Sequence, residues 1–313
     1  MGSLAEEFKQ KQNREKIPSA TEAAQENLWE YEKLIDPKFF KEERWHLKEI
    51  AETLQALVED RIIRVVPEVE WHIAEPEEVK RLQEQGIKYQ CCRKLKLNIP
   101  PRHGKSYSLQ RFEQWYLGRN NENTVITVSY NETLSNRFSA NVRDGIDATK
   151  IDKKITIFSD VFPNTKIKYG DAAKNIWALA GRFFNYLGTS FGGTLTGVGC
   201  RLGVIDDPVK SDKEAYNDTI LQEQWDWYVD TYLSRIEEGG YQIIKTSMKD
   251  GFYPKELLKR AKSIRILLCG KFWKKPVQKL PLSSTLGRVN ILFMYRRLTI
   301  RWLVSILLLM ALR

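Results

Sequence analysis

Cysteine and histidine are scarce in this 313-residue chain, which contains four of the first and three of the second. The cysteines show no spacing typical of metal ligands, and two of them are adjacent: Cys91, Cys92, Cys200 and Cys269. This pattern argues against a zinc site and against a disulfide framework. A reducing environment fits the pattern best, so we expect a cytoplasmic protein.

Targeting signals and long apolar runs are missing as well. The N-terminal stretch MGSLAEEFKQKQNREK is charged and has no apolar centre, unlike a secretory signal. The charge-free segment from Trp302 to Leu312 is too short to cross a bilayer. We expect no membrane association, although the basic and apolar tail also permits an interfacial helix.

Acidic residues are absent from residues 257–313, which contain thirteen lysines and arginines. The preceding residues hold 37 basic and 40 acidic side chains, so the formal charge of +10 comes from the tail. Basic proteins commonly bind nucleic acid, but this distribution weakens that inference for the body of the chain. Translation outside an ancestral reading frame would explain a tail without acids, and we favour that interpretation over a selected function.

The chain divides into four regions of different pattern. They are a flexible lead-in, a helical N-terminal region with an inserted segment, a region of alternating patterns and an anomalous basic and apolar tail, at residues 1–18, 19–92, 93–250 and 251–313. Ser19 and Glu22 have the spacing of a capping box, which predicts a helix start. The inserted segment covers residues 66–92 and contains an expected helix over 77–85 that ends at Gly86.

The alternating region predicts an α/β fold. Strands are expected at KLKLNI, TVITVSY, NIWALA, FFNYLGTS, RLGVID and YQIIKTS, and helices at 106–117, 132–146 and 211–236. Strands and helices in alternation imply a mostly parallel sheet that helices cover on both faces.

A phosphate-binding pattern lies in KLNIPPRHGKSYS, residues 96–108. Such a loop needs a strand before it and a helix after it, and both are expected here. Gly104 would let the backbone approach a phosphate, Lys105 would balance its charge and Ser106 would bind magnesium. Isoleucine stands where the usual first glycine lies, so a chance surface turn is the alternative.

The second pattern is CRLGVIDDPVKS, residues 200–211, in which a buried strand ends in two carboxylates. Asp206 would orient magnesium, and Asp207 would polarise an attacking water. These acids belong at the carboxyl end of a strand, beside the phosphate loop. A plain turn at Asp206, Asp207 and Pro208 is the alternative, but the two patterns together favour nucleotide binding.

Four segments in this order resemble the large subunit of the tailed-bacteriophage terminase: PPRHGKS, SYNETLSNRFSANVRDGI, GTSFGGTLTGVGCRLGVIDDPVKSDKEA and QWDWYVDTYLSRIEEGGYQII. The resemblance covers about residues 40–244. It implies a P-loop ATPase of the additional-strand, catalytic-glutamate class, with ATP and Mg²⁺ as cofactors. The implied partners are double-stranded DNA, the terminase small subunit and the portal protein of the prohead, with a homo-oligomer as the active form in the host cytoplasm.

The resemblance also assigns roles to individual residues. The expected nucleotide-binding residues are Pro101, Arg102, His103, Gly104, Lys105 and Ser106. Ser106 and Asp206 are the expected metal ligands. Asp207 stands where many relatives place the catalytic glutamate, which makes it the expected general base. Arg102 resembles a loop arginine that stabilises the γ-phosphate, and a salt bridge within the loop is the alternative for it.

Likeness to the family fades after the last segment. QIIKTSMKDG keeps Thr246 of a coupling motif but has Ser247 and Met248 where arginine and an aromatic residue are expected. Nothing from residue 251 onward resembles the family's nuclease, which needs several carboxylates for its metals. We therefore expect a truncated motor ATPase without nuclease activity. A degenerate prophage remnant without catalysis, or another P-loop ATPase such as a helicase, are the alternatives.

Overall fold

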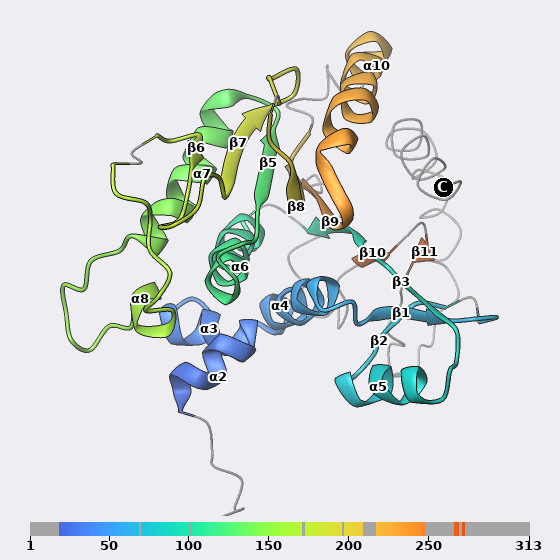
Figure 1. Ribbon diagram of the computed structural model, residues 1–313, viewed down its shortest axis with the longest axis horizontal. Coiled ribbons are helices and arrows are strands. Elements are labelled where there is room, and N and C mark those ends of the chain that lie inside the picture. Colours follow the sequence, from blue (N-terminus) through green and yellow to red (C-terminus); the bar gives the residue numbers. More distant parts are fainter. Residues whose placement is uncertain are drawn as a thin grey trace, which may run out of the picture.

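The computed structural model describes residues 19–68, 70–99, 102–170, 173–195, 197–208 and 217–247, together with two short strands at 266–268 and 271–272. Helices at the N-terminus precede a small antiparallel sheet, and a larger, mostly parallel sheet follows (Figure 1). The fold is therefore α/β, as the alternating pattern predicts.

The N-terminal region begins with three helices, α2 (Ala20–Glu26), α3 (Leu28–Ile35) and α4 (Trp45–Val58). The capping box is present, because the Ser19 hydroxyl accepts from the Glu22 N–H and the Glu22 carboxylate accepts from the Ser19 N–H. Buried residues of these helices belong to the same hydrophobic cluster as Leu95 and Leu97 of the large sheet. The N-terminal helices and the sheet thus share one core.

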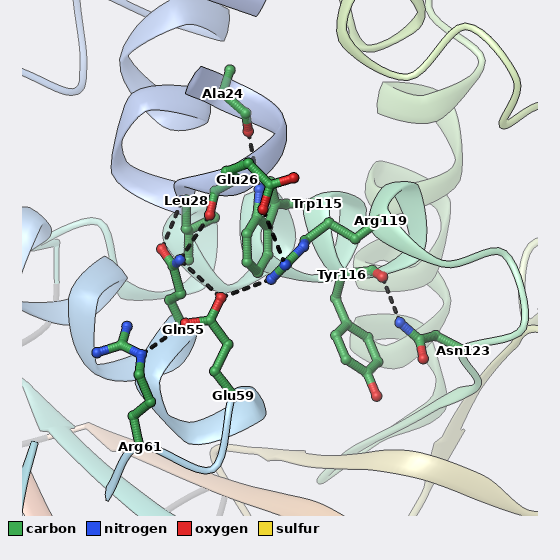
Figure 2. A network of polar contacts seen from close by, with 10 residues as sticks. All are labelled: Ala24, Glu26, Leu28, Gln55, Glu59, Arg61, Trp115, Tyr116, Arg119 and Asn123. Carbon is green, nitrogen blue, oxygen red and sulfur yellow. Dashed lines mark hydrogen bonds and ion pairs between the residues drawn. The ribbon is translucent and has the colours of Figure 1, made fainter. Parts of the chain in front are cut away.

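A polar network joins these helices to α6 (Lys105–Arg119), the helix that follows the first strand of the large sheet (Figure 2). The Gln55 side chain accepts from the Leu28 N–H at 2.9 Å and donates to the Glu26 carbonyl at 2.8 Å. The Trp115 indole donates to the Ala24 carbonyl at 3.1 Å, and Arg119 donates to Glu59 at 2.8 Å. The Leu28 N–H and the Trp115 indole are buried, so their bonds remove a desolvation cost that an unpaired donor would leave.

A three-stranded antiparallel sheet has the order β2-β1-β3. β1 (Ile62–Val65) lies just before the inserted segment, and β2 (His72–Ile73) and β3 (Tyr89–Cys91) lie within it. The helix expected over 77–85 is present as α5 (Pro76–Glu84), and Gly86 follows it with φ +64°. The sequence did not predict the strands, because runs of two to four residues are too short to show alternation.

The large sheet has the order β11-β10-β4-β9-β8-β5-β7-β6. Its central strands are parallel neighbours: β4 (Lys94–Ile99), β9 (Ile236–Ser247), β8 (Cys200–Asp206), β5 (Val125–Ser129) and β7 (Tyr186–Ser190). The strand β6 (Ile176–Trp177) pairs antiparallel with β7. Within the otherwise undescribed tail, β10 (Ile266–Leu268) pairs antiparallel with β4, and β11 (Lys271–Phe272) pairs antiparallel with β10. The sequence predicted neither strand.

Helices bury both faces of this sheet. α6 and α7 (Glu132–Ile146) contribute to the main core, with the single helical turn α8 (Phe158–Val161) beside them. A second cluster covers the opposite face, where Tyr228 and Tyr232 pack with Ile126 and Val128 of β5. These tyrosines lie in a π-helical turn, η1 (Tyr228–Tyr232), which follows α10 (Asp218–Trp227) and leads into a 3₁₀ turn, η2 (Leu233–Arg235).

The cysteines differ from expectation at one position. Cys91 and Cys200 are free thiols, whereas Cys92 takes part in a disulfide bond whose other half lies outside the described residues. Adjacent residues of an extended segment point to opposite sides, so Cys91 and Cys92 face different neighbours. One of two adjacent cysteines can therefore form a disulfide bond while the other remains free.

Candidate functional site

The two sequence patterns meet at one edge of the large sheet. β4 ends at Ile99, just before the phosphate-loop pattern, and β8 ends at Asp206. β9 lies between them and pairs in parallel with both. Parallel strands carry their carboxyl ends to the same edge, so the loop and the two carboxylates become neighbours.

The loop residue Gly104 is the N-cap of α6 and has φ +82°. A Cβ atom at this position would lie 2.8 Å from Phe39 Cζ, because the N-terminal region packs against the loop. Both the backbone angle and the close approach therefore require glycine. No side chain caps the start of α6, so its first N–H groups form the kind of donor set that binds an anion.

Lys105 begins α6 and is 5% exposed. Its Nζ donates to the Ile99 carbonyl at 3.0 Å, so the ammonium group folds back over the end of β4. Burial lowers the pKa of Lys105 to about 8, and the nearby negative charge of Asp207 opposes this shift. The side chain is thus a partly desolvated cation that a polyanion would stabilise.

Lys245 of β9 is the centre of the site. Its Nζ donates to the Ser106 hydroxyl at 2.6 Å, forms an ion pair with Asp206 Oδ1 and lies 3.5 Å from Asp207 Oδ2. The strand register explains this contact, because Asp206 and Lys245 are directly paired between β8 and β9. Lys245 is 1% exposed.

The two carboxylates differ in their surroundings. Burial raises the pKa of Asp206, and the attraction of Lys245 opposes the rise. Asp207 is more exposed than Asp206. Its backbone has φ +45°, and its N–H donates to the Lys245 carbonyl at 3.0 Å. A positive φ is uncommon outside glycine, and such strained positions concentrate at functional sites.

Arg102 shows the same backbone feature, with φ +62°, and its side chain is exposed. The neighbouring His103 is half-buried and its ring lies 5.9 Å from the ring of His46 on α4. Burial lowers the pKa of His46, and the adjacent His103 adds to that effect. Pro101 lies outside the described residues. The site brings together Lys105, Ser106, Asp206 and Asp207, whereas His103 contacts the N-terminal region.

A buried carboxyl group lies behind this cluster. Glu113 of α6 is fully buried, accepts from the Tyr186 hydroxyl at 2.7 Å and accepts from the Thr127 hydroxyl at 3.2 Å. Burial raises the pKa of Glu113 to about 8, although both hydrogen bonds oppose the rise. The side chain is therefore largely neutral at physiological pH.

The sequence analysis missed Lys245 and Glu113. The signal for Lys245 was a charged residue inside the apolar run QIIKTS, at the position that the strand register places opposite Asp206. Nothing comparable marks Glu113, since a glutamate in the middle of an amphipathic helix is usually exposed.

The groups of this site that could hold a metal are oxygen donors. Ser106 supplies a hydroxyl and Asp206 a carboxylate, which fit Mg²⁺ because it prefers oxygen ligands and usually keeps several waters. No cluster of three or more His, Cys, Asp or Glu residues suited to a metal exists within the described part of the chain.

The described helices include none that is long and apolar enough to span a membrane. Among known proteins, neither a family model nor a curated sequence matches the chain.

Proposed function

We propose that this chain is a P-loop ATPase and that, in line with its resemblance to the terminase large subunit, it is the motor subunit of viral DNA packaging. The observation that carries the proposal is that Ser106, Asp206 and Asp207 meet at the buried Lys245. Lys105 lies near enough for the charges of both carboxylates to act on its pKa. The placement of β9 between β4 and β8 supports the additional-strand class of such enzymes.

Each residue of the site would have one task. The start of α6 and the Lys105 ammonium group would bind the phosphates, and Gly104 would allow their close approach. Ser106 and Asp206 would hold Mg²⁺, which neutralises charge on the phosphates when bound. Arg102 lies on the same loop and would reach the γ-phosphate from solvent.

Asp207 would act as the general base. Its carboxylate would accept a proton from the water whose oxygen attacks the γ-phosphorus, while the bond between that phosphorus and the bridging oxygen of ADP breaks. The side chain is partly exposed, so it has access to water, and its Oδ2 lies 3.5 Å from the Lys245 Nζ. Double-stranded DNA, a small subunit and a portal protein remain proposed partners that follow from the resemblance.

The test is phosphate release from ATP, with binding of a fluorescent ATP analogue measured in parallel. Lys105→Ala should abolish binding and turnover together, because it removes the phosphate-binding cation. Asp207→Asn should preserve binding and lower turnover at least ~100-fold, which is the scale of general-base catalysis. Lys153→Ala changes an exposed lysine far along the chain and serves as the control. Unchanged turnover in Lys105→Ala would refute the proposal.

One observation favours the alternative of a catalytically inactive remnant. Lys245 already engages the oxygens of Ser106 and Asp206 that would hold the metal. Nucleotide binding without any turnover in the wild-type protein, with or without DNA, would select this alternative.

A further inference from the structure

Oxygen atoms surround the ammonium group of Lys245. Such surroundings are typical of a bound cation and unusual for a side chain in the core. It lies at the end of the central strand β9, almost completely buried, and its Nζ contacts oxygens from two other elements. Ser106 belongs to α6, whereas Asp206 and Asp207 end β8. The ammonium group therefore links the two halves of the site across β9.

The oxygens that Lys245 contacts are the same ones that form the expected metal site. A protein-bound magnesium lies roughly 2.0–2.1 Å from its oxygen ligands. The Nζ of Lys245 is 2.6 Å from the Ser106 hydroxyl and is within ion-pair contact of Asp206, so the ammonium group and a metal cannot occupy this place together.

The charges of the site balance without a metal. The site contains two lysines, Lys105 and Lys245, and two aspartates, Asp206 and Asp207, so the formal charges of these side chains sum to zero. A buried carboxylate without a compensating cation is costly, so some cation has to remain beside Asp206. In the absence of a metal, Lys245 fulfils this need.

We propose that Lys245 is an internal counter-ion that competes with a divalent cation for the oxygens of Ser106 and Asp206. This inference rests on the proposed function only in taking these oxygens as the metal site. Metal entry then requires Lys245 to move away, and the chain alone has weak affinity for magnesium. Loading of the site would depend on the additional negative charge of a nucleotide, which draws the metal in and gives the displaced ammonium group a new partner.

The experiment compares the full-length wild-type protein with Lys245→Met, which keeps the length of the side chain and removes its charge. Thermal unfolding is recorded with MgCl₂ from zero to saturation, without nucleotide, at constant ionic strength. Lys245→Met should be less stable than wild type without metal and should regain stability as magnesium rises. Its apparent magnesium affinity should be at least roughly tenfold tighter than that of wild type, because no buried ion pair has to break first.

Two comparisons make the result specific. Lys96→Met removes another buried lysine, on β4, and should gain no magnesium dependence. The double variant Lys245→Met with Asp206→Asn removes both charges and should lose the magnesium response, because the main carboxylate ligand is gone. A magnesium response that persists in the double variant would place the metal elsewhere and overturn the inference.

Other outcomes are equally informative. Equal magnesium affinity in wild type and Lys245→Met would overturn the inference, and so would a variant that stays unfolded at every magnesium concentration, since the metal would then be unable to replace the ammonium group. The readout requires no hydrolysis. An absence of ATP turnover would therefore count against the proposed function, while the magnesium response would still decide the role of Lys245.

Discussion

The buried carboxyl group of Glu113, beside the candidate site, predicts how the stability of the chain changes with pH. The side chain is fully buried between α6 and the sheet, where the hydroxyls of Tyr186 and Thr127 donate to it. Burial raises its pKa from 4.5 to about 8. Between these two values the folded chain keeps a proton that the unfolded chain releases, so folding becomes less favourable as pH rises.

The size of this pH dependence follows from the difference between the pKa values of Glu113 in the unfolded and folded chain. The contribution of Glu113 to stability is fully present below pH 4.5 and is lost as pH rises through about 8. Within this window the free energy of unfolding falls by about 1.4 kcal/mol per pH unit from this group alone. Glu113→Gln keeps a neutral side chain of the same shape and has no proton to release. From pH 5 to pH 7 the variant should therefore gain about 3 kcal/mol relative to wild type.

The assay is urea unfolding followed by tryptophan fluorescence at pH 5, 6 and 7. Other titrating groups act equally on both proteins, so the difference between the two curves isolates Glu113. Glu52→Gln removes an exposed carboxylate on α4 and shows the effect of losing one charge by itself. A stability difference between Glu113→Gln and wild type that does not change with pH would refute the assignment of a neutral, buried carboxyl group.

Three further predictions concern packing around the site. Gly104→Ala should destabilise the chain by more than Gly86→Ala in chemical denaturation and should also weaken nucleotide binding. Gly86 also has a positive φ but no atom within 4 Å of an added Cβ, so it isolates a backbone cost of about 1–2 kcal/mol. Gln55→Ala should cost about 1–3 kcal/mol and speed proteolysis of the N-terminal helices, because it leaves the Leu28 N–H without its acceptor; an unchanged proteolysis rate would contradict this. Gly203→Ala should cost about 1–3 kcal/mol through contact with the Tyr232 hydroxyl, and Tyr232→Phe should restore part of the loss, because that hydroxyl has no hydrogen-bond partner among the described residues. Additive costs in the double variant would show that the two side chains do not compete.

The sequence predicted the parts of this fold whose pattern is long and regular. α7 begins and ends where expected, and β4, β5 and β8 follow from their apolar runs. That β4 and β8 end at the same edge of the sheet also follows, because neighbouring strands of a parallel sheet run in one direction. These features depend on local pattern together with a general rule of topology.

The role of Lys245 and the small sheet could be recognised only from the structure. The side-chain partners of Lys245 depend on which strand lies beside β8 and in which register, and the sequence pattern carries neither. The small sheet is built from short strands, and its β1 and β2 are joined by tertiary pairing between residues such as Ile62 and Ile73. Of the tail, only β10 and β11 are described, so most of its expected character lies outside the described residues.

Helix α6 joins the candidate site to the N-terminal helices. Its first turn carries Lys105 and Ser106, and Arg119 at its end bonds to Glu59 beside the N-terminal helices. Fifteen helical residues form a stiff rod roughly 22 Å long. The N-terminal region contacts both ends of this rod, through Phe39 at Gly104 and through Glu59 at Arg119. A displacement of the N-terminal helices would therefore move the whole of α6, and Lys105 and Ser106 with it, without any strand of the sheet having to slide.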